Sequence, residues 1–167
     1  MVDTFAHAAI SYLLFRKWAK KKRDILLSML FGTLSDLASW TVYLIYLLIS
    51  GNFLIGRPSM QNIPEWVFTL YGISHSIFVY GLVLLIVYLF IRRIPIYLWA
   101  WGLHIVIDIP THSREFLSTP FLWPISVWHF PGISWGTSWF FLSYWLLIIF
   151  GFILVLWEKI MHNKKNK

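Results

Sequence analysis

The sequence predicts an all-α integral membrane protein with about five membrane-embedded helices, and three observations lead to this fold class. Of the 167 residues, 59% are hydrophobic and only 13% are charged. The charges are concentrated in short stretches, so the runs 66–91 and 135–157 contain no Lys, Arg, Asp or Glu. About 20 apolar residues suffice for a helix to cross a bilayer. We therefore expect a single membrane domain over residues 1–167.

Five apolar segments follow one another along the chain. Three of them are long enough to span a bilayer, and the first of these three, 25–50, carries a single charge, Asp36. The two shorter segments, 2–16 and 94–109, suit short spans, tilted helices or helices packed behind the longer ones. We expect helices at residues 2–16, 25–50, 66–91, 94–109 and 135–157, followed by a basic cytoplasmic tail at 158–167.

The last helix is preceded by a long loop, 110–134, which contains four prolines and therefore cannot form one continuous helix. The loop is also rich in Phe and Trp, and Trp is favoured where a membrane meets water. We expect this aromatic loop to lie at the outer surface of the bilayer.

The basic residues predict the orientation, because cytoplasmic loops are enriched in Lys and Arg. If all five segments cross, twelve of the 14 basic residues share one side: Arg16, Lys17, Lys20, Lys21, Lys22, Arg23, Arg92, Arg93, Lys159, Lys164, Lys165 and Lys167. Only Arg57 and Arg114 fall outside this set. We expect a multi-pass protein of the inner (cytoplasmic) membrane with its N-terminus outside and its C-terminus in the cytoplasm.

The same distribution explains the net charge of +7 as topology signals and contacts with anionic lipid, so we expect the bilayer and no nucleic acid as a partner. Protein partners are not predicted. Cysteine is absent, which excludes disulfides and thiolate ligands.

Ionisable groups inside membrane segments cost about 2.5–3.5 kcal/mol each on insertion scales, so each needs a partner or a purpose. Four of the predicted helices carry such groups in the outer half of the bilayer, and a further imidazole lies just past the fourth helix. These residues are His7, Asp36, His75, His104, Asp108 and His112.

His104 and Asp108 are four residues apart and therefore share one face of a helix, whereas Pro110 is expected to break that helix before His112. Neutral imidazole and carboxylate suit a divalent metal, with Zn or Mn favoured, and the set could hold one or two ions. Taken singly, each His could instead make an ordinary interhelical hydrogen bond. Their shared depth favours a common metal or polar site.

Other polar residues are predicted to support this site. Ser11, Ser35, Ser74 and Ser76 lie beside the candidate ligands or one helical turn away, where they could orient them. Arg114 lies at the outer mouth and could steer an anionic substrate.

The ordered motifs resemble those of the YdjM-like family of inner-membrane proteins. In this chain the motifs are FAHAAISYLLF, FGTLSDLASW, YGISHSIFV and HIVIDIPTHS, followed by STPFLWPIS and FPGISWGTSW. The resemblance covers roughly residues 4 to 140 and implies a membrane-bound metal-dependent hydrolase. It places metal ligands at His7, Asp36, His75, His104 and Asp108, with His112 a further member.

Three functions compete. In a hydrolase, Asp36 or Asp108 would act as metal ligand or general base, and the substrate would be a lipid-like phosphoester, such as a lipid or an envelope precursor. In a metal-ion or proton transporter, the same groups would form a relay. In a non-catalytic scaffold, they would form a structural metal or polar cluster. An open coordination position would favour catalysis, and a saturated one would favour the scaffold.

Overall fold

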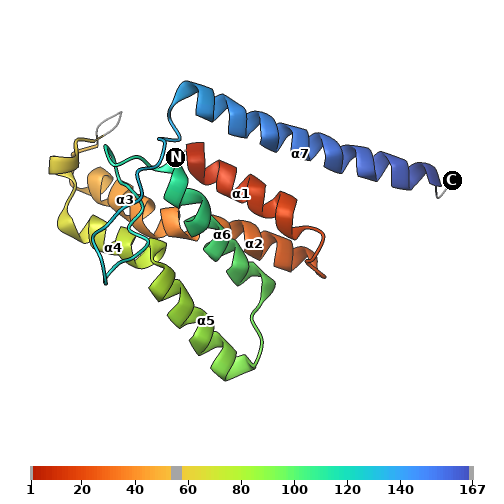
Figure 1. Cartoon of the computed structure of the whole chain (residues 1–167), viewed down its shortest axis with the longest axis horizontal. Coiled ribbons are helices and arrows are strands. Elements are labelled where there is room, and N and C mark those ends of the chain that lie inside the picture. The colour runs from red at the N-terminus through yellow and green to blue at the C-terminus, as the bar shows by residue number, and fades with distance from the viewer. Residues whose placement is uncertain (1, 54–57, 166–167) are drawn as a thin grey trace.

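The computed structural model describes residues 2–53 and 58–165, and all regular elements in these ranges are helical (Figure 1). The predicted basic residues Arg57 and Lys167 lie outside the described residues. In chain order the elements are α1 Val2–Phe15, α2 Lys22–Asp36, η1 Leu37–Thr41, α3 Val42–Ile49, η2 Met60–Asn62, α4 Glu65–His75, α5 Ile77–Ile91, α6 Ile96–Thr111 and α7 Ser138–Lys165.

The second apolar segment forms one helical run, Lys22–Ile49, with a π-helical turn inserted at η1. This turn begins directly after Asp36, and the Ser39 hydroxyl donates to the Ser35 carbonyl at 3.1 Å within it. Insertions of this kind are frequent at functional sites, and they shift the register of the side chains around them. Asp36 thus lies at the junction of two helical registers.

The third segment, expected as a single helix over 66–91, is broken between α4 and α5, which are bent by 54°. Ser76 adopts an extended conformation at the break, and its hydroxyl accepts hydrogen bonds from the Phe78 and Val79 amides. The Ile77 amide donates to the Phe121 carbonyl in the aromatic loop at 3.0 Å. The loop therefore supplies the acceptor for the Ile77 amide, which in a continuous helix would donate to a carbonyl of the same helix.

The fourth segment ends before His112, as expected, but two residues later than predicted, because α6 continues through Pro110 to Thr111 and His112 is extended. A proline removes one amide donor, and here the helix is only one residue from its end. The His112 amide still donates to the Asp108 carbonyl at 3.2 Å. His112 therefore stays one helical turn beyond Asp108, as His104 stays one turn before it.

Two helices are long and apolar enough to cross a membrane, namely the run Lys22–Ile49 and α7, and the bent pair α4–α5 could make a third. The expectation of five spans is not supported, because α1 has only 14 residues and α6 only 16. Both short helices pack against α2 instead.

The last helix is longer than expected, since α7 includes residues 158–165 of the predicted tail. Lysines in its final turn favour this extension, because cations stabilise the negative end of a helix dipole. At the same end of the molecule, Glu158 accepts from Arg16 at 2.6 Å and from Lys17 at 2.8 Å. These contacts connect the end of α1 to α7.

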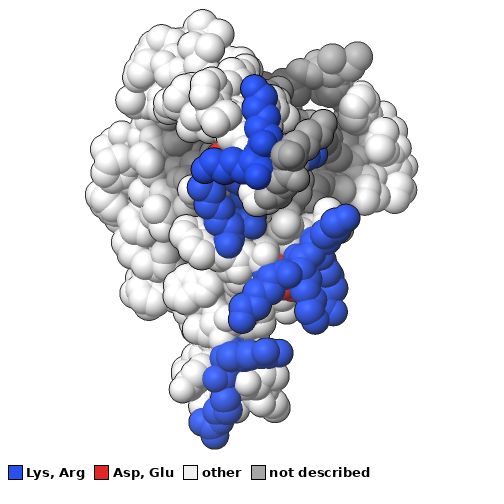
Figure 2. Space-filling model, turned by 90° about the vertical axis from the view of Figure 1, so that its right-hand side faces the viewer, with Lys and Arg blue, Asp and Glu red and all other residues white. Residues whose placement is uncertain are grey.

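Basic side chains gather on one end of the molecule. Figure 2 shows them in three groups on a single face, which the α1–α2 turn, the α5–α6 turn and the C-terminal end of α7 all reach. The described members of the predicted cytoplasmic set thus share one side of the structure, although fewer helices span than expected.

The interior is unusually polar for so apolar a chain. A small hydrophobic cluster of Tyr43, Ile63, Val67, Tyr71 and Leu117 lies next to α4, whereas many large apolar side chains are exposed. The largest fully buried side chains include two imidazoles and a carboxylate instead. Apolar surface outside and polar groups inside are typical of a protein whose solvent is lipid.

Candidate metal centre

Four of the predicted ligand residues converge at the centre of the helices. Asp36 ends α2, His75 ends α4, and His104 and Asp108 face inward from α6. All four are buried, and each offers one ligand atom within 4.8 Å of the others. This cluster of Asp36, His75, His104 and Asp108, called here the metal cluster, could hold a metal ion.

The spacing of the ligand atoms matches coordination of a single ion. His75 Nε2 and His104 Nε2 each lie 3.2 Å from Asp108 Oδ2, and they are 3.1 Å from each other. Asp36 Oδ1 lies slightly farther out, at 3.8 and 3.9 Å from the two nitrogens. Zinc bonds of 2.0–2.1 Å in tetrahedral geometry separate ligand atoms by about 3.3 Å.

Hydrogen bonds on the far side of each ring define which nitrogen faces the cluster with a lone pair. His104 Nδ1 donates to the Gly32 carbonyl at 2.8 Å, and His75 Nδ1 donates to the Tyr71 carbonyl at 3.0 Å. A carbonyl oxygen only accepts, so both Nδ1 atoms carry protons. In the neutral rings, both Nε2 atoms then present lone pairs to the cluster, which is the arrangement that a metal-ligating histidine requires.

The cluster therefore directs two imidazole lone pairs and two carboxylate oxygens at one another. Neither oxygen of Asp108 receives a hydrogen bond from the described residues, although both are fully buried. Acceptors buried together without a donor are costly. A divalent cation would remove this cost, because its charge would balance the two carboxylates and its bonds would satisfy the four acceptors.

His7 and His112 approach the other oxygen of Asp108. His7 Nε2 lies 2.9 Å from Asp108 Oδ1, and its ring packs at a tilt of 40° against the His104 ring, with centroids 4.0 Å apart. His112 Nδ1 lies 3.8 Å from the same oxygen and 3.3 Å from the Asp108 carbonyl. All six predicted ligand residues therefore lie close together, but only the four of the metal cluster place ligand atoms within 4.8 Å of one another.

The predicted supporting serines have different surroundings. The Ser35 hydroxyl donates to the Ser74 carbonyl at 3.0 Å, which joins α2 to α4 one residue away from two of the ligands. Ser11 is buried on α1 against Gly32. Ser76 turns away from the cluster, because its hydroxyl caps α5 and donates to the Trp123 carbonyl in the aromatic loop. The Ser74 hydroxyl, at 2.9 Å from His75 Nδ1, contacts that ring instead.

Three supporting residues were not predicted. Thr4 donates to Asp36 Oδ2 at 2.7 Å, Gly32 supplies the carbonyl that orients His104, and Thr119 donates to the Asp108 carbonyl at 2.9 Å. Thr4 lies three residues before His7, and Gly32 four before Asp36, so helical spacing was a usable signal for both. Thr119 lies in the aromatic loop and offered no such signal.

A cavity of about 1020 Å³ adjoins the metal cluster. Asp36, Thr4 and His112 line it, so at least one ligand and one supporting residue border open space. Its other walls are largely aromatic and aliphatic, with Trp40, Tyr43, Tyr46, Leu47, Phe116 and Trp135 among them. The metal cluster is therefore buried from most directions and accessible from this side.

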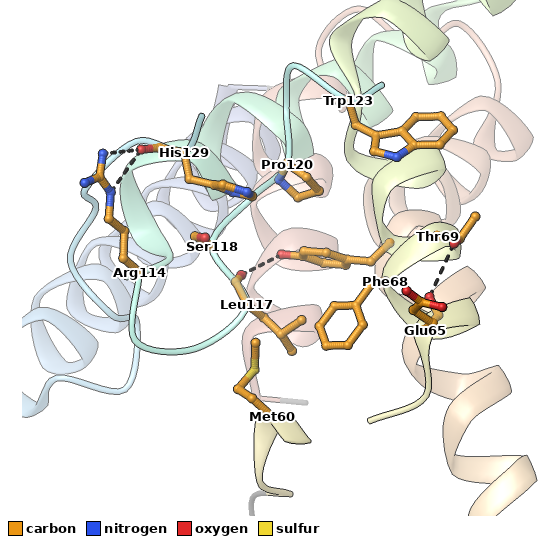
Figure 3. Close-up of a pocket in the computed structure, with 11 residues that line it drawn as sticks. Met60, Glu65, Phe68, Thr69, Arg114, Leu117, Ser118, Pro120, Trp123 and His129 are labelled. Carbon is orange, nitrogen blue, oxygen red and sulfur yellow. Dashed lines mark hydrogen bonds between the residues drawn. The ribbon is translucent and has the colours of Figure 1, made fainter. Parts of the chain in front are cut away.

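Arg114 lies elsewhere, in a separate cavity of about 420 Å³ (Figure 3). Its guanidinium donates twice to the His129 carbonyl, at 3.1 and 2.7 Å, and the side chain points along the aromatic loop. Arg114 does not line the cavity beside Asp36, and the two cavities share Leu117 as a wall. The predicted steering role therefore has no direct path to the metal cluster.

The fold and the cluster define a helical membrane protein with a buried group of His and Asp that could bind a metal ion. Comparison of the chain with protein-family models, with curated proteins and with solved structures finds no match to any of them. The function has to be inferred from the geometry of the site.

Proposed function

We propose that this chain is a membrane-bound, metal-dependent hydrolase, and that it belongs to the YdjM-like family whose motifs its sequence resembles. The observation that carries the proposal is the convergence of four ligand atoms from three helices on one point, where neither oxygen of Asp108 receives a hydrogen bond from the described residues. Two nitrogen and two oxygen ligands suit Zn or Mn.

The residues in and around the metal cluster would have different roles. Asp36, His75, His104 and Asp108 would hold the ion, and the Gly32 and Tyr71 carbonyls would keep both rings oriented. When bound, a divalent ion supplies Lewis-acid polarisation of the scissile group and acidifies a water molecule. Asp36 borders the cavity, and Thr4 binds its second oxygen, so Asp36 is placed to accept a proton from the side on which a substrate would enter.

The cavity beside Asp36 favours catalysis over a structural role. An ion in a purely structural site is enclosed by its protein ligands, whereas a catalytic site keeps a position open. Transport would need access to the metal cluster from both sides of the membrane. The cavity of about 1020 Å³ reaches the cluster from the side on which Asp36 and His112 lie.

We further propose that the substrate is a phosphoester in a lipid or an envelope precursor. Aromatic and aliphatic side chains dominate the cavity, which suits a molecule with an apolar part beside its reacting group. The basic end of the molecule would face the cytoplasm of a cell with an inner membrane. His104, Asp108 and His112 step along α6 away from that end, so the site would open in the outer half of the bilayer.

A hydrolysis assay tests the proposal. Purified full-length protein in detergent, supplied with Mn or Zn, should cleave a chromogenic phosphodiester or a phospholipid in mixed micelles. Asp36→Asn and His104→Ala should lower the rate by about 100-fold or more, and a chelator should abolish it. His162→Ala, on the exposed end of α7, is the matched control and should retain the wild-type rate. Unchanged rates in both cluster variants would refute the proposal.

A further inference from the structure

The cavity of about 420 Å³ that Arg114 lines lies between the start of α4 and the aromatic loop, away from the basic end of the molecule (Figure 1). Its volume is within the range of small-ligand sites, about 300–1,000 Å³. None of the four residues of the metal cluster lines it. Its walls are in part apolar, formed by Phe68, Leu117, Pro120 and Trp123.

Two opposite charges lie on opposite sides of this cavity. Figure 3 shows Arg114 on one side, next to His129, and Glu65 on the other. Among the described residues, no ion pair or hydrogen bond joins the side chains of Arg114 and Glu65. A cavity with a cation and an anion held apart is complementary to a ligand that carries both charges.

The guanidinium of Arg114 is anchored to the aromatic loop. Its Nε and Nη2 donate to the His129 carbonyl at 3.1 and 2.7 Å, and these bonds fix the direction of an otherwise exposed side chain. A guanidinium has more N–H donors than these two, and its planar fork suits phosphate oxygens. Arg114 can therefore bind a phosphate while it stays anchored.

Glu65 would select the other end of the ligand. An ionised carboxylate only accepts hydrogen bonds. A primary ammonium donates several, whereas a quaternary ammonium has no N–H group and donates none. The Glu65 side therefore favours a primary ammonium over a quaternary one.

We propose that this cavity binds a phosphoethanolamine group, with its phosphate at Arg114 and its primary ammonium at Glu65. Phosphoethanolamine is the headgroup of a phospholipid and also a free solute, and the chemistry of recognition is the same for both. The expected position of the aromatic loop at the membrane surface favours the lipid. The inference does not depend on the proposed hydrolysis, because the metal cluster takes no part in this site.

A competition assay on full-length protein in detergent, with a chelator present throughout, tests the proposal. The probe is a phosphatidylethanolamine that carries its fluorophore on an acyl chain, which leaves the ammonium intact. Unlabelled short-chain phosphatidylethanolamine should compete at least about 10-fold better than the matching phosphatidylcholine or phosphatidylglycerol, because only its headgroup can satisfy both charged residues. Soluble phosphoethanolamine separates the two sources: equal competition by it would assign the site to the free solute, and competition by the lipid alone would assign it to the membrane.

Two variants assign the two ends of the ligand. Glu65→Gln should lower the affinity for phosphatidylethanolamine to that for phosphatidylcholine, and Arg114→Gln should weaken the binding of all three lipids by about 10-fold. Both side chains are exposed, so neither change should unfold the chain. Glu115→Gln and Arg93→Gln, which remove exposed charges outside the cavity, are the matched controls and should bind like the wild type.

Equal competition by the three lipids in the wild type would overturn the proposal. A preference for phosphatidylethanolamine that survives in both Glu65→Gln and Arg114→Gln would overturn it as well. Because the chelator removes any metal, selective binding in this assay supports the site even if the protein hydrolyses no phosphoester, and chelator-sensitive hydrolysis by a protein without this preference would leave only the proposed function standing.

Discussion

Gly32 affects both the orientation of the His104 ring and the packing of α1 against α2. Its carbonyl accepts from His104 Nδ1, and a Cβ built at its position would collide with the Ser11 hydroxyl on α1. The absence of a side chain therefore lets α1 and α2 approach closely enough to bring His7 beside His104. Small residues commonly permit such close contacts between membrane helices.

Gly32→Ala should destabilise the protein by about 1–3 kcal/mol, because the new methyl group must push α1 away. Thermal unfolding in detergent measures the effect. Gly81→Ala is the matched control, since nothing lies within 4 Å of a Cβ at that position in α5. The control should leave stability unchanged or raise it by up to about 1 kcal/mol. Equal stability of the two variants would contradict this account of the α1–α2 contact.

Thr4 is the second residue with a specific role, because its hydroxyl donates to the Asp36 oxygen that faces away from the histidines. Groups that orient metal ligands typically contribute 10–100-fold to metal affinity. Thr4→Val should therefore weaken metal binding by about 10-fold or more, measured by competition with a chromogenic chelator. Thr69→Val, which removes an exposed hydroxyl bonded within its own helix, should leave the affinity unchanged. Equal affinities in the two variants would exclude an orienting role for Thr4.

At the scale of the elements, the break between α4 and α5 is the feature on which the site depends most. It ends α4 at His75, whose ring also packs on Tyr71 with centroids 4.0 Å apart. The backbone groups freed by the break are satisfied by the Ser76 hydroxyl and by the Phe121 carbonyl. The aromatic loop thus fixes the direction of α5 relative to the helix that carries His75.

Ser76→Ala should cost about 1 kcal/mol of stability, as expected for a lost N-terminal cap, but should retain metal binding and hydrolysis. Its hydroxyl points to backbone groups and not to the metal cluster, so it is not a nucleophile in this account. Ser143→Ala, on the exposed face of α7, should change stability by less than about 0.5 kcal/mol. Loss of hydrolysis in a folded, metal-loaded Ser76→Ala protein would show that the assignment is wrong.

The elements differ in how far the sequence predicts them. Helical spacing predicts the pairing of His104 and Asp108 on α6, because it depends only on local geometry. The break at Ser76 could not be predicted this way, since the residues around it read as one apolar run and its acceptors come from the distant loop. The end of α6 was also missed by two residues, because a proline next to a helix end costs less than one in its middle.

At the scale of the whole molecule, the number of spans was overestimated because apolar composition does not distinguish lipid contact from packing. The short helices α1 and α6 are apolar, yet both pack against α2 and contribute polar residues to the interior. The shared depth of the ionisable residues was the more informative signal. It led to the cluster even though the spans that carry these residues were counted incorrectly.

The arrangement of basic residues predicts the topology, and the lack of cysteine makes the test simple. Single substitutions Lys21→Cys and Lys164→Cys place a thiol at the basic end, whereas Gln61→Cys places one in the loop between α3 and α4. A membrane-impermeant maleimide should label Gln61→Cys in cells with an intact inner membrane, and the other two only after permeabilisation. Labelling of Lys21→Cys and Gln61→Cys from the same side would contradict this topology.

The central claim is that the metal cluster binds a divalent cation, and metal analysis of the purified full-length protein tests it most directly. After loading with Zn or Mn and removal of free metal, the wild type should retain about one equivalent or more. His162→Ala should match it, whereas His75→Ala should retain almost none, because the cluster would lose one of its two imidazole ligands. A folded wild-type protein that retains no metal, or a His75→Ala protein that retains as much as the wild type, would contradict the claim.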